Sequence, residues 1–502
     1  MTATPSRRSI IQTMAVAAVT VGGLGGRSPA QAAPHRTVVN VLDHGAAGDG
    51  QTDDSAAFQS AIDSIAEAGG GDLVVPARTY VIASAAADGC VVLRADDMTV
   101  RAEGATILRP DKFDNAVFVA NTRSEEPLGY GAGVRGLRWI GGRFVGNLAE
   151  SNFMCPFSLH HAQDCTFSGI TFQDHIGRGS HVFDMVGADS IVIEGCSFLG
   201  QQTHPDDTEN VGEAIQLGAS YKGGLTGGSG NYGFSGLMCR DITVRDCEFL
   251  PFGDQAGPTP FGFHGGVEGK HHQRLSFVDN VVVDPRTSLT PDDSERDTVN
   301  RGAVHLSDAH GVTITGNRFT QTTGRVNRAV TIMGFDFGVL EGADPDKPTR
   351  GDFAAPQGPA DIRIEDNVFE GFPARDGYDT VAVRGLDGAA VPGVVISNNT
   401  IRDGYASAAT EHSAAIQLGN LEGPVISGNT IEDHHVGLDL TAGPISDAEV
   451  TGNEITNSTA PDAPAAIMVD SGLTDSVVRK TTTSGYDQAV AGEPGEGTVI
   501  ED

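Results

Sequence analysis

The chain has 502 residues, and its 66 acidic side chains outnumber 33 basic ones, which gives a formal net charge of −33. This charge argues against nucleic acid and anionic membrane surfaces as partners. After the N-terminal segment, no stretch approaches the ~20 apolar residues that cross a bilayer. The composition suits a soluble secreted protein.

The first 33 residues are expected to be an export signal rather than part of the fold. Arg7 and Arg8 precede the apolar run Met14–Gly26, and small residues around Ala32 offer a cleavage site. This order resembles a twin-arginine signal, and an ordinary secretory signal with two arginines is the alternative. Either signal places the mature protein outside the cytoplasm.

Residues 38–85 are predicted to form a cap in the order strand, turn, helix, glycine stop and strand. Asp53 or Asp54 begins the helix, and Gly69–Gly71 end it. The apolar face of the helix comprises Phe58, Ala61, Ile62 and Ile65. Such a helix covers the open hydrophobic end of a stack of repeats.

A six-residue pattern then recurs about ten times: apolar, any, any, then Asn, Cys or Gly, any, apolar. Its fourth positions lie 24 to 51 residues apart, at Gly142, Ile170, Cys196, Cys247, Asn280, Asn317, Asn367, Asn399, Asn429 and Asn453. This period indicates stacked coils, in which the Asn amides of successive turns hydrogen-bond along the stack.

We therefore predict an all-β fold, a right-handed parallel β-helix of about ten or more coils. A single domain is expected over residues 38–480, and residues 481–502 form a tail or last partial coil. A capped stack of this kind is expected to be a monomer.

The six cysteines show no C-x-x-C spacing, which argues against a zinc site. Cys196 and Cys247 share the repeated position, so we expect stacked, buried thiols there. A local disulfide between Cys155 and Cys165 is the alternative use of this residue type.

The segment VLDHGAAGDGQTDDSAAFQSAI, followed by GGGDLVVPARTYVI, resembles the start of the pectate-lyase-like superfamily. That group includes rhamnogalacturonase-like glycoside hydrolases, polysaccharide lyases, epimerases and phage tail-spike depolymerases. With the coils, the resemblance covers roughly residues 38–480, and it implies the fold and a polysaccharide substrate. Because the motif builds the cap, Asp49, Asp53 and Asp54 are expected to be structural.

A strand about twelve residues before each repeated position supplies the candidate site. Side chains alternate between the two faces of a strand, and neighbouring coils lie ~4.8 Å apart, so outward residues form columns. One column is expected to run through His160 (or Ser158), Asp184, Gln216, His264, His305, Thr331, Arg384, Gln417 and Asp439. A second column, two or three residues earlier, holds His181, Glu213 and Arg328.

Two chemistries fit this polar patch. Hydrolysis, the leading hypothesis, uses Asp184 and Glu213 as a carboxylate pair around a glycosidic bond. Elimination or epimerisation of a uronate polymer instead uses His264 or His305 as the base, with Arg328 or Arg301 neutralising the substrate carboxylate.

The substrate-binding candidates are His160, His181, Gln216, Arg301, Arg328, Tyr221 and Tyr232. The two tyrosines and Phe234 lie in the first of two long insertions, where aromatic rings suit stacking on sugars. His271 and His272 are weaker candidates. A third hypothesis is a glycan-binding surface protein without catalysis.

No cofactor or metal is expected to be required. The acidic runs 205–209 and 291–297 are compatible with calcium, but such runs are more typical of solvated turns. The Asn-Thr-Asp, paired-aspartate, Gly-His and Arg-x-Lys motifs of pectin hydrolases are absent in that order. The negative charge favours neutral or weakly charged glycans.

Overall fold

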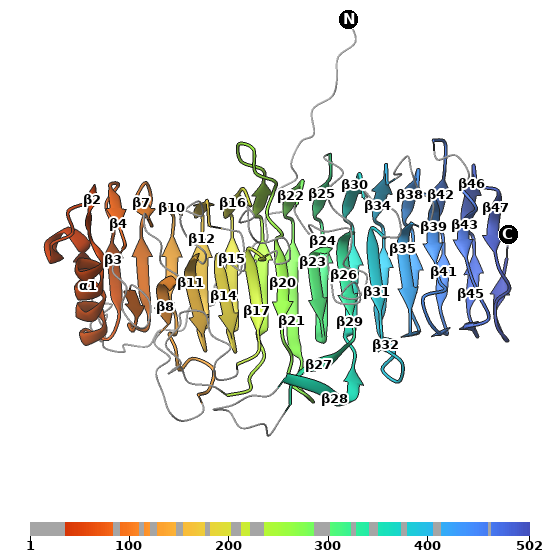
Figure 1. Ribbon diagram of the computed structural model, residues 1–502, viewed down its shortest axis with the longest axis horizontal. Helices are drawn as coiled ribbons and strands as arrows, with labels where there is room; N and C mark the ends of the chain where they lie inside the picture. Colours follow the sequence, from red (N-terminus) through yellow and green to blue (C-terminus); the bar gives the residue numbers. More distant parts are fainter. Residues whose placement is uncertain are drawn as a thin grey trace, which may run out of the picture. The chain divides into compact units, whose positions relative to one another are not determined.

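The structure is a computed structural model. It describes residues 36–83, 91–109, 115–120, 128–146, 154–175, 181–201, 212–220, 235–285, 302–322, 328–340, 350–372, 379–404, 413–459 and 463–501. Over these residues the chain from Thr37 on winds through three long parallel sheets, here called sheets I, II and III (Figure 1). The predicted all-β parallel β-helix is confirmed.

From β3 (Gly71–Val74) on, successive strands visit the sheets in the order I, II, III, and in the first turn α1 (Ser55–Glu67) follows sheet II in place of a sheet III strand. Sheet I consists of β1 (Thr37–Asn40), β3 (Gly71–Val74), β6 (Met98–Arg101), β9 (Arg138–Ile140), β12 (Gln163–Ser168), β15 (Asp189–Glu194), β18 (Arg240–Arg245), β21 (His272–Val278), β24 (Ala309–Thr315), β29 (Ala360–Glu365), β33 (Val394–Ser397), β37 (Val425–Ser427), β41 (Glu449–Thr451), β45 (Val477–Arg479) and β48 (Val499–Ile500).

Sheet II consists of β2 (Asp49–Asp53), β4 (Thr79–Val81), β7 (Thr106–Leu108), β10 (Arg143–Val145), β13 (Thr171–Gln173), β16 (Ser197–Leu199), β19 (Glu248–Leu250), β22 (Val281–Val283), β25 (Arg318–Thr320), β30 (Val368–Glu370), β34 (Thr400–Arg402), β38 (Thr430–Glu432), β42 (Glu454–Thr456) and β46 (Thr482–Ser484).

Sheet III consists of β5 (Val91–Leu93), β8 (Asn115–Ala120), β11 (Met154–His160), β14 (Phe183–Val186), β17 (Ile215–Gly218), β20 (Phe261–His264), β23 (Gly302–Ser307), β26 (Arg328–Met333), β31 (Val381–Arg384), β35 (Ala414–Gly419), β39 (Val436–Asp439), β43 (Ala465–Met468) and β47 (Gln488–Ala491).

Two small sheets accompany the coils. The hairpin β27 (Phe335–Val339) and β28 (Arg350–Gln357) is antiparallel and forms part of the second long insertion, at the lower edge of Figure 1. A four-stranded sheet lines the later turns from sheet III to sheet I, with strands β32 (Val391–Pro392), β36 (Leu421–Glu422), β40 (Ile445–Ser446) and β44 (Leu473–Thr474).

The last apolar residue of the repeated pattern fills the core. It lies in sheet II and pairs with its counterpart in the next coil, as in Phe172 with Phe198 and Phe198 with Phe249. The Phe198 and Phe249 rings stack with centroids 4.6 Å apart and planes only 5° from parallel. Offset stacking of buried rings adds to the gain from burial, so the aromatic repeats stabilise the middle coils.

The predicted asparagine ladder is present. Each Nδ2 donates to the Oδ1 of the next Asn at 2.9–3.1 Å, and each backbone N–H donates to the same oxygen, through Asn280, Asn317, Asn367, Asn399, Asn429 and Asn453. Cys247 begins this ladder by donating its N–H to Asn280. Because these buried amides have hydrogen-bond partners in the coils on both sides, they avoid the free-energy cost of burying a polar group without a hydrogen bond.

The cysteines within the described residues are buried free thiols, so the alternative of a Cys155–Cys165 disulfide is wrong. Cys155 and Cys165 belong to different sheets, β11 and β12, and each sulfur lies near backbone carbonyls rather than the other thiol. Cys196 and Cys247 are each 1% exposed, as stacked residues of the repeat should be.

The helix α1 (Ser55–Glu67) lies at the N-terminal end of the stack beside β3 and β5 and is preceded by the 3₁₀ turn η1 (Val41–His44). Its predicted apolar face, Phe58, Ala61, Ile62 and Ile65, is fully buried. Asp54 occupies the N-cap position, but its Oδ1 accepts from the Ala47 N–H, 2.6 Å away, rather than from the helix. Instead, the Asp53 carboxylate accepts from the Ser55 N–H at 3.0 Å. These carboxylates tie the cap together, as expected for structural residues.

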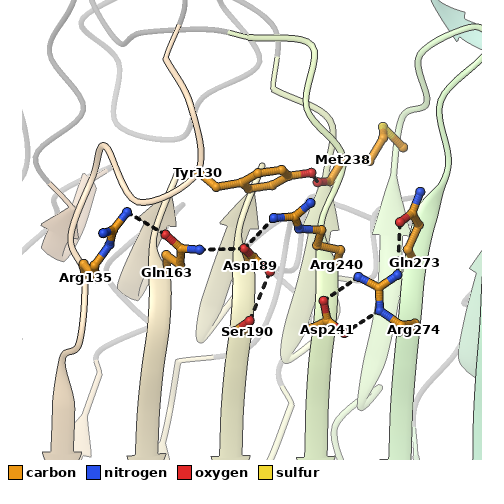
Figure 2. A network of polar contacts seen from close by, with 10 residues as sticks. All are labelled: Tyr130, Arg135, Gln163, Asp189, Ser190, Met238, Arg240, Asp241, Gln273 and Arg274. Atoms are coloured by element: carbon orange, nitrogen blue, oxygen red, sulfur yellow. Dashed lines mark hydrogen bonds and ion pairs between the residues drawn. The ribbon is translucent and has the colours of Figure 1, made fainter.

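A polar row follows the first residues of the middle sheet I strands (Figure 2). Asp189 of β15 accepts from Gln163 and Arg240 of the two neighbouring strands, each at 2.8 Å. Tyr130 lies over the Arg240 guanidinium, 4.0 Å from the ring centroid, and its hydroxyl donates to the Met238 carbonyl. The row links successive coils on the outside, as the asparagines do inside.

Among the described residues, no helix is long and apolar enough to cross a membrane.

Candidate functional site

The register of sheet III defines the predicted column. It runs Ser158, Asp184, Gln216, Gly262, His305, Thr331, Ala382, Gln417 and Asp439. The expected column positions of His264 and Arg384 are therefore wrong by two residues, because these residues lie two positions further along the same strands. They pair with Gly218 and Met333, respectively. His160 likewise pairs with Val186, so Ser158 is the column member.

Glu213 is the centre of the patch. Its Oε1 lies 2.7 Å from His305 Nε2, although β23 is not the neighbouring strand but one further along the sheet. On the other side, His181 Nδ1 lies 2.8 Å from the Glu213 carbonyl oxygen and 3.6 Å from its Oε2. Two predicted histidines thus flank one predicted carboxylate.

The protonation of His305 follows from its partners. Its Nδ1 lies 3.1 Å from the Gly302 carbonyl oxygen, which can only accept, so Nδ1 carries a hydrogen. A carboxylate oxygen at 2.7 Å from Nε2 requires a second proton between them, on either His305 or Glu213. The pair therefore holds one transferable proton.

A second imidazole–carboxylate pair lies one coil earlier. His160 Nε2 is 3.0 Å from Asp184 Oδ2, and both side chains are at most 2% exposed. Asp184 pairs in register with Gln216, so this pair adjoins the strand that follows Glu213. The structure thus brings together the predicted residues Asp184, Glu213, His160, His181, Gln216 and His305.

Arg328 belongs to the opposite side of the patch. Its guanidinium lies 3.9 Å from the carboxylate of Asp379, which also accepts from Arg384 at 3.3 Å. Burial raises the pKa of Asp379 to about 6, against the opposing effect of the two arginines. Both arginines thus lie beside the same carboxylate, Arg328 on the strand next to that of His305 and Arg384 on the strand after it.

The patch is closed to solvent in this structure. Although the column occupies the outer face of sheet III, each of the described patch side chains is less than a tenth exposed: His160, His181, Asp184, Glu213, Gln216, His305, Arg328 and Thr331. A low-dielectric setting strengthens the charge interactions between these groups.

Several predicted residues lie outside the described part of the chain. These are Tyr221, Tyr232, Phe234 and Arg301, the acidic runs 205–209 and 291–297, and the export signal, while His264 is described only through its backbone. The weaker candidate His271 contacts the buried carboxylate of Asp308 and stacks on His310, with centroids 3.8 Å apart. His272 accepts the Cys239 N–H and has its pKa lowered to about 4 by burial.

Two residues of the patch were not recognised in the sequence. Gly262 occupies a column position but has no side chain, so the prediction gave this position to His264, two residues further along the strand. Asp379 lies two residues before Val381 of β31, in the same frame as Arg328 before Val330. The sequence could have revealed Asp379 by this spacing, because His181 and Glu213 also lie two residues before the equivalent strand positions, Phe183 and Ile215.

Comparison with known proteins supports the fold assignment. Residues 38–90 match the family described as rhamnogalacturonase A/epimerase, pectate lyase-like. Over these residues the chain matches the start of a pectate-lyase-like domain. This confirms the resemblance predicted from the cap motif.

Three relatives of this pectate-lyase-like domain are informative. Plasmin and fibronectin-binding protein A of Streptococcus pneumoniae is 26% identical over 260 residues, 48% of this chain and 34% of that protein. The crystal structure of this surface adhesin, PfbA, has a TM-score of 0.57 and 17% identity, covering 93% of each chain. The tailspike protein of E. coli bacteriophage HK620, in complex with a pentasaccharide, has a TM-score of 0.52 and 14% identity, covering 92% of this chain and 80% of that one.

Mannuronan C5-epimerase AlgE5 of Azotobacter vinelandii is 38% identical over 98 residues, 18% of this chain and 10% of that protein. The chain thus spans about a third or less of the curated relatives that it matches. At under 25% identity, the two solved structures are evidence of the shared fold alone.

Proposed function

We propose that this pectate-lyase-like domain is a polysaccharide-active enzyme that moves a proton at a uronate residue, by elimination or epimerisation. The observation that carries the proposal is the His305–Glu213 contact of 2.7 Å, with the second ring nitrogen of His305 fixed by Gly302. Once the pair has released its shared proton to solvent, Nε2 of His305 accepts the proton next to the substrate carboxylate, and Nδ1 keeps its hydrogen bond to the Gly302 carbonyl oxygen. The carboxylate of Glu213 then stabilises the resulting imidazolium.

The remaining groups of the patch suit the other requirements of this chemistry. Removing a proton beside a carboxylate builds negative charge, which Arg328 and Arg384 are placed to offset. The His160–Asp184 pair supplies a second proton carrier. Given to the leaving glycosidic oxygen, its proton completes elimination; given to the opposite face of the same carbon, a proton completes epimerisation.

The relatives support this substrate class. AlgE5 is named a mannuronan C5-epimerase, and another relative, 35% identical over 98 residues, is named alginate lyase 7. PfbA is described as a surface adhesin, and with the export signal expected in residues 1–33 we place this protein outside the cytoplasm. Arg328 and Arg384 in the patch offset the repulsion between an anionic polymer and a chain with a net charge of −33.

The test is digestion of polymannuronate, polygalacturonate and polyglucuronate beside neutral glycans, with calcium or with a chelator. Ultraviolet absorbance of an unsaturated uronate reports elimination, and proton NMR of the polymer reports a change in C5 configuration. Either signal on a uronate polymer supports the proposal. New reducing ends without absorbance would overturn it.

That contrary result would support hydrolysis, the second candidate. Asp184 and Glu213 come from neighbouring coils, which suits a carboxylate pair on the two sides of a glycosidic bond. We rank it below proton transfer because each carboxylate already faces an imidazole. Saturable binding of a glycan with neither signal would indicate a non-catalytic surface protein.

A further inference from the structure

The contact between Glu213 and His305 skips a coil. Glu213 lies two residues before the start of β17, His305 belongs to β23, and β20 lies between these strands in sheet III. Neighbouring strands are ~4.8 Å apart, so residues two strands apart are separated by roughly 10 Å of backbone. Side chains bridge that distance only where the intervening strand leaves room.

Gly262 provides that room. In register it pairs with Gln216 on one side and with His305 on the other. A Cβ built on Gly262 would lie 2.3 Å from His305 Nε2, 2.4 Å from His305 Cε1 and 2.5 Å from Glu213 Cγ. The two side chains therefore meet in the space that any other residue at this position would fill.

Backbone conformation does not explain the glycine. Gly262 lies outside the positive-φ region that favours this residue, so its backbone is open to alanine. A glycine within a strand otherwise costs stability through chain entropy and lost packing. What alanine would disturb is the His305–Glu213 pair.

We infer that Gly262 is a positioning residue: its missing side chain brings His305 of one coil onto Glu213 of another and so assembles the proton-transfer pair. The inference rests on the proposed function for its catalytic consequence, but its structural content stands independently. It assigns Gly262 a role in setting the reactivity of the site without contact with the reacting atoms.

The first measurement compares Gly262→Ala with Gly351→Ala in full-length protein on whichever uronate polymer the wild type processes. Gly351 in β28 has no positive φ, and its added Cβ would touch only Leu340 at 4.0 Å. We expect Gly262→Ala to lower kcat about 100-fold with KM nearly unchanged, the range of general acid–base catalysis. The limb of the pH–rate profile due to the pair should disappear, whereas Gly351→Ala should match the wild type.

A second measurement tests the contact without any activity. The melting temperature is compared for wild type, Gly262→Ala, His305→Ala and the double variant. We expect Gly262→Ala to lower Tm by several degrees in the wild-type background and by less than about one degree in the His305→Ala background. The space vacated by the imidazole then lets the Glu213 side chain, whose Cγ the new methyl group would also meet, move aside. Equal losses in both backgrounds would overturn the inference.

The two measurements separate the two proposals. If no polymer is processed by the wild type but the Tm effects are non-additive, the positioning role stands and the proposed function fails. If Gly262→Ala retains wild-type kcat and the Tm effects add, Gly262 has no positioning role.

Discussion

At the scale of single residues, the proton held between His305 and Glu213 is the feature most open to test. We expect Glu213→Gln and His305→Ala each to lower turnover of a uronate polymer about 100-fold. Glutamine still donates to an imidazole nitrogen but cannot exchange a proton with it, so the fold should survive while the chemistry is lost.

The measurement is steady-state kinetics with circular dichroism on the same samples. His44→Ala is the matched control, because this half-buried imidazole lies in the cap, where it hydrogen-bonds Ser60 at 3.0 Å. Turnover above half of the wild-type value in both patch variants would remove His305 and Glu213 from the mechanism.

At the scale of elements, the asparagine ladder lies at the turn between sheets I and II and links this turn in each coil to the same turn in the next coil. Asn367 donates to the Ile314 carbonyl and to Asn399, and it accepts from Asn317. Asn367→Ala leaves several of these buried groups unpaired, and we expect a loss of about 3 kcal/mol in unfolding free energy.

Denaturant unfolding and hydrogen exchange measure this loss. The exchange data should place it in the coils around β25, β30 and β34, since each repeat contacts only its neighbours. Asn457→Ala, at a less buried asparagine that bonds Gly485, should cost less than about 1 kcal/mol. Equal costs at the two positions would show that the ladder contributes little.

The outer polar row gives a separate prediction at this scale (Figure 2). Although burial opposes it, hydrogen bonds from Arg240, Ser190 and Gln163 lower the pKa of Asp189. A lowered folded-state pKa stabilises the fold at neutral pH, and this contribution disappears as the pH falls through that value. Asp189→Asn should therefore cost about 1 kcal/mol at pH 7 and progressively less below about pH 4.

Thermal unfolding of Asp189→Asn and wild type at pH 7 and pH 3 checks this. Asp241→Asn is the control, because the Arg274–Asp241 pair is 57% and 38% exposed and such pairs contribute little. A deficit for Asp189→Asn that grows as the pH falls would contradict the assignment of the hydrogen bonds.

At the scale of the whole molecule, the repeat made the coils predictable because one physical need recurs in each of them. A buried amide at Asn317 or Asn429 demands a partner, and the same residue one coil away supplies it. The frame of the patch was also predictable, since alternation along a strand places Asp184 and Gln216 outward. The choice between Gly262 and His264 was not predictable, because the two residues are two positions apart in β20 and alternation puts both in the same frame.

The contacts within the patch depend on information that the sequence pattern lacks. Alternation identifies an outward residue but not the partner that it finds two coils away. The pairing of Glu213 with His305 depends on the empty position at Gly262. Arg328 pairs with Asp379, which lies two residues before β31 of the next coil. These are consequences of turn lengths between strands, which set the register.

Buried acids give the last prediction, the dependence of global stability on pH. Burial raises the pKa of Asp379 to about 6, and it does the same for Asp308 despite the contact of Asp308 with His271. Because the folded protein binds these protons more tightly than the unfolded chain, their contribution is fully present below about pH 4 and is lost as the pH rises through 6. Asp379→Asn keeps the neutral form at every pH, so its unfolding free energy relative to wild type should rise by about 3 kcal/mol between pH 4 and pH 7. Denaturant titrations across this range measure the difference, and Asn367→Ala, which removes no titratable group, should show a constant deficit. A constant difference for Asp379→Asn as well would mean that the two arginines keep this carboxylate ionised throughout.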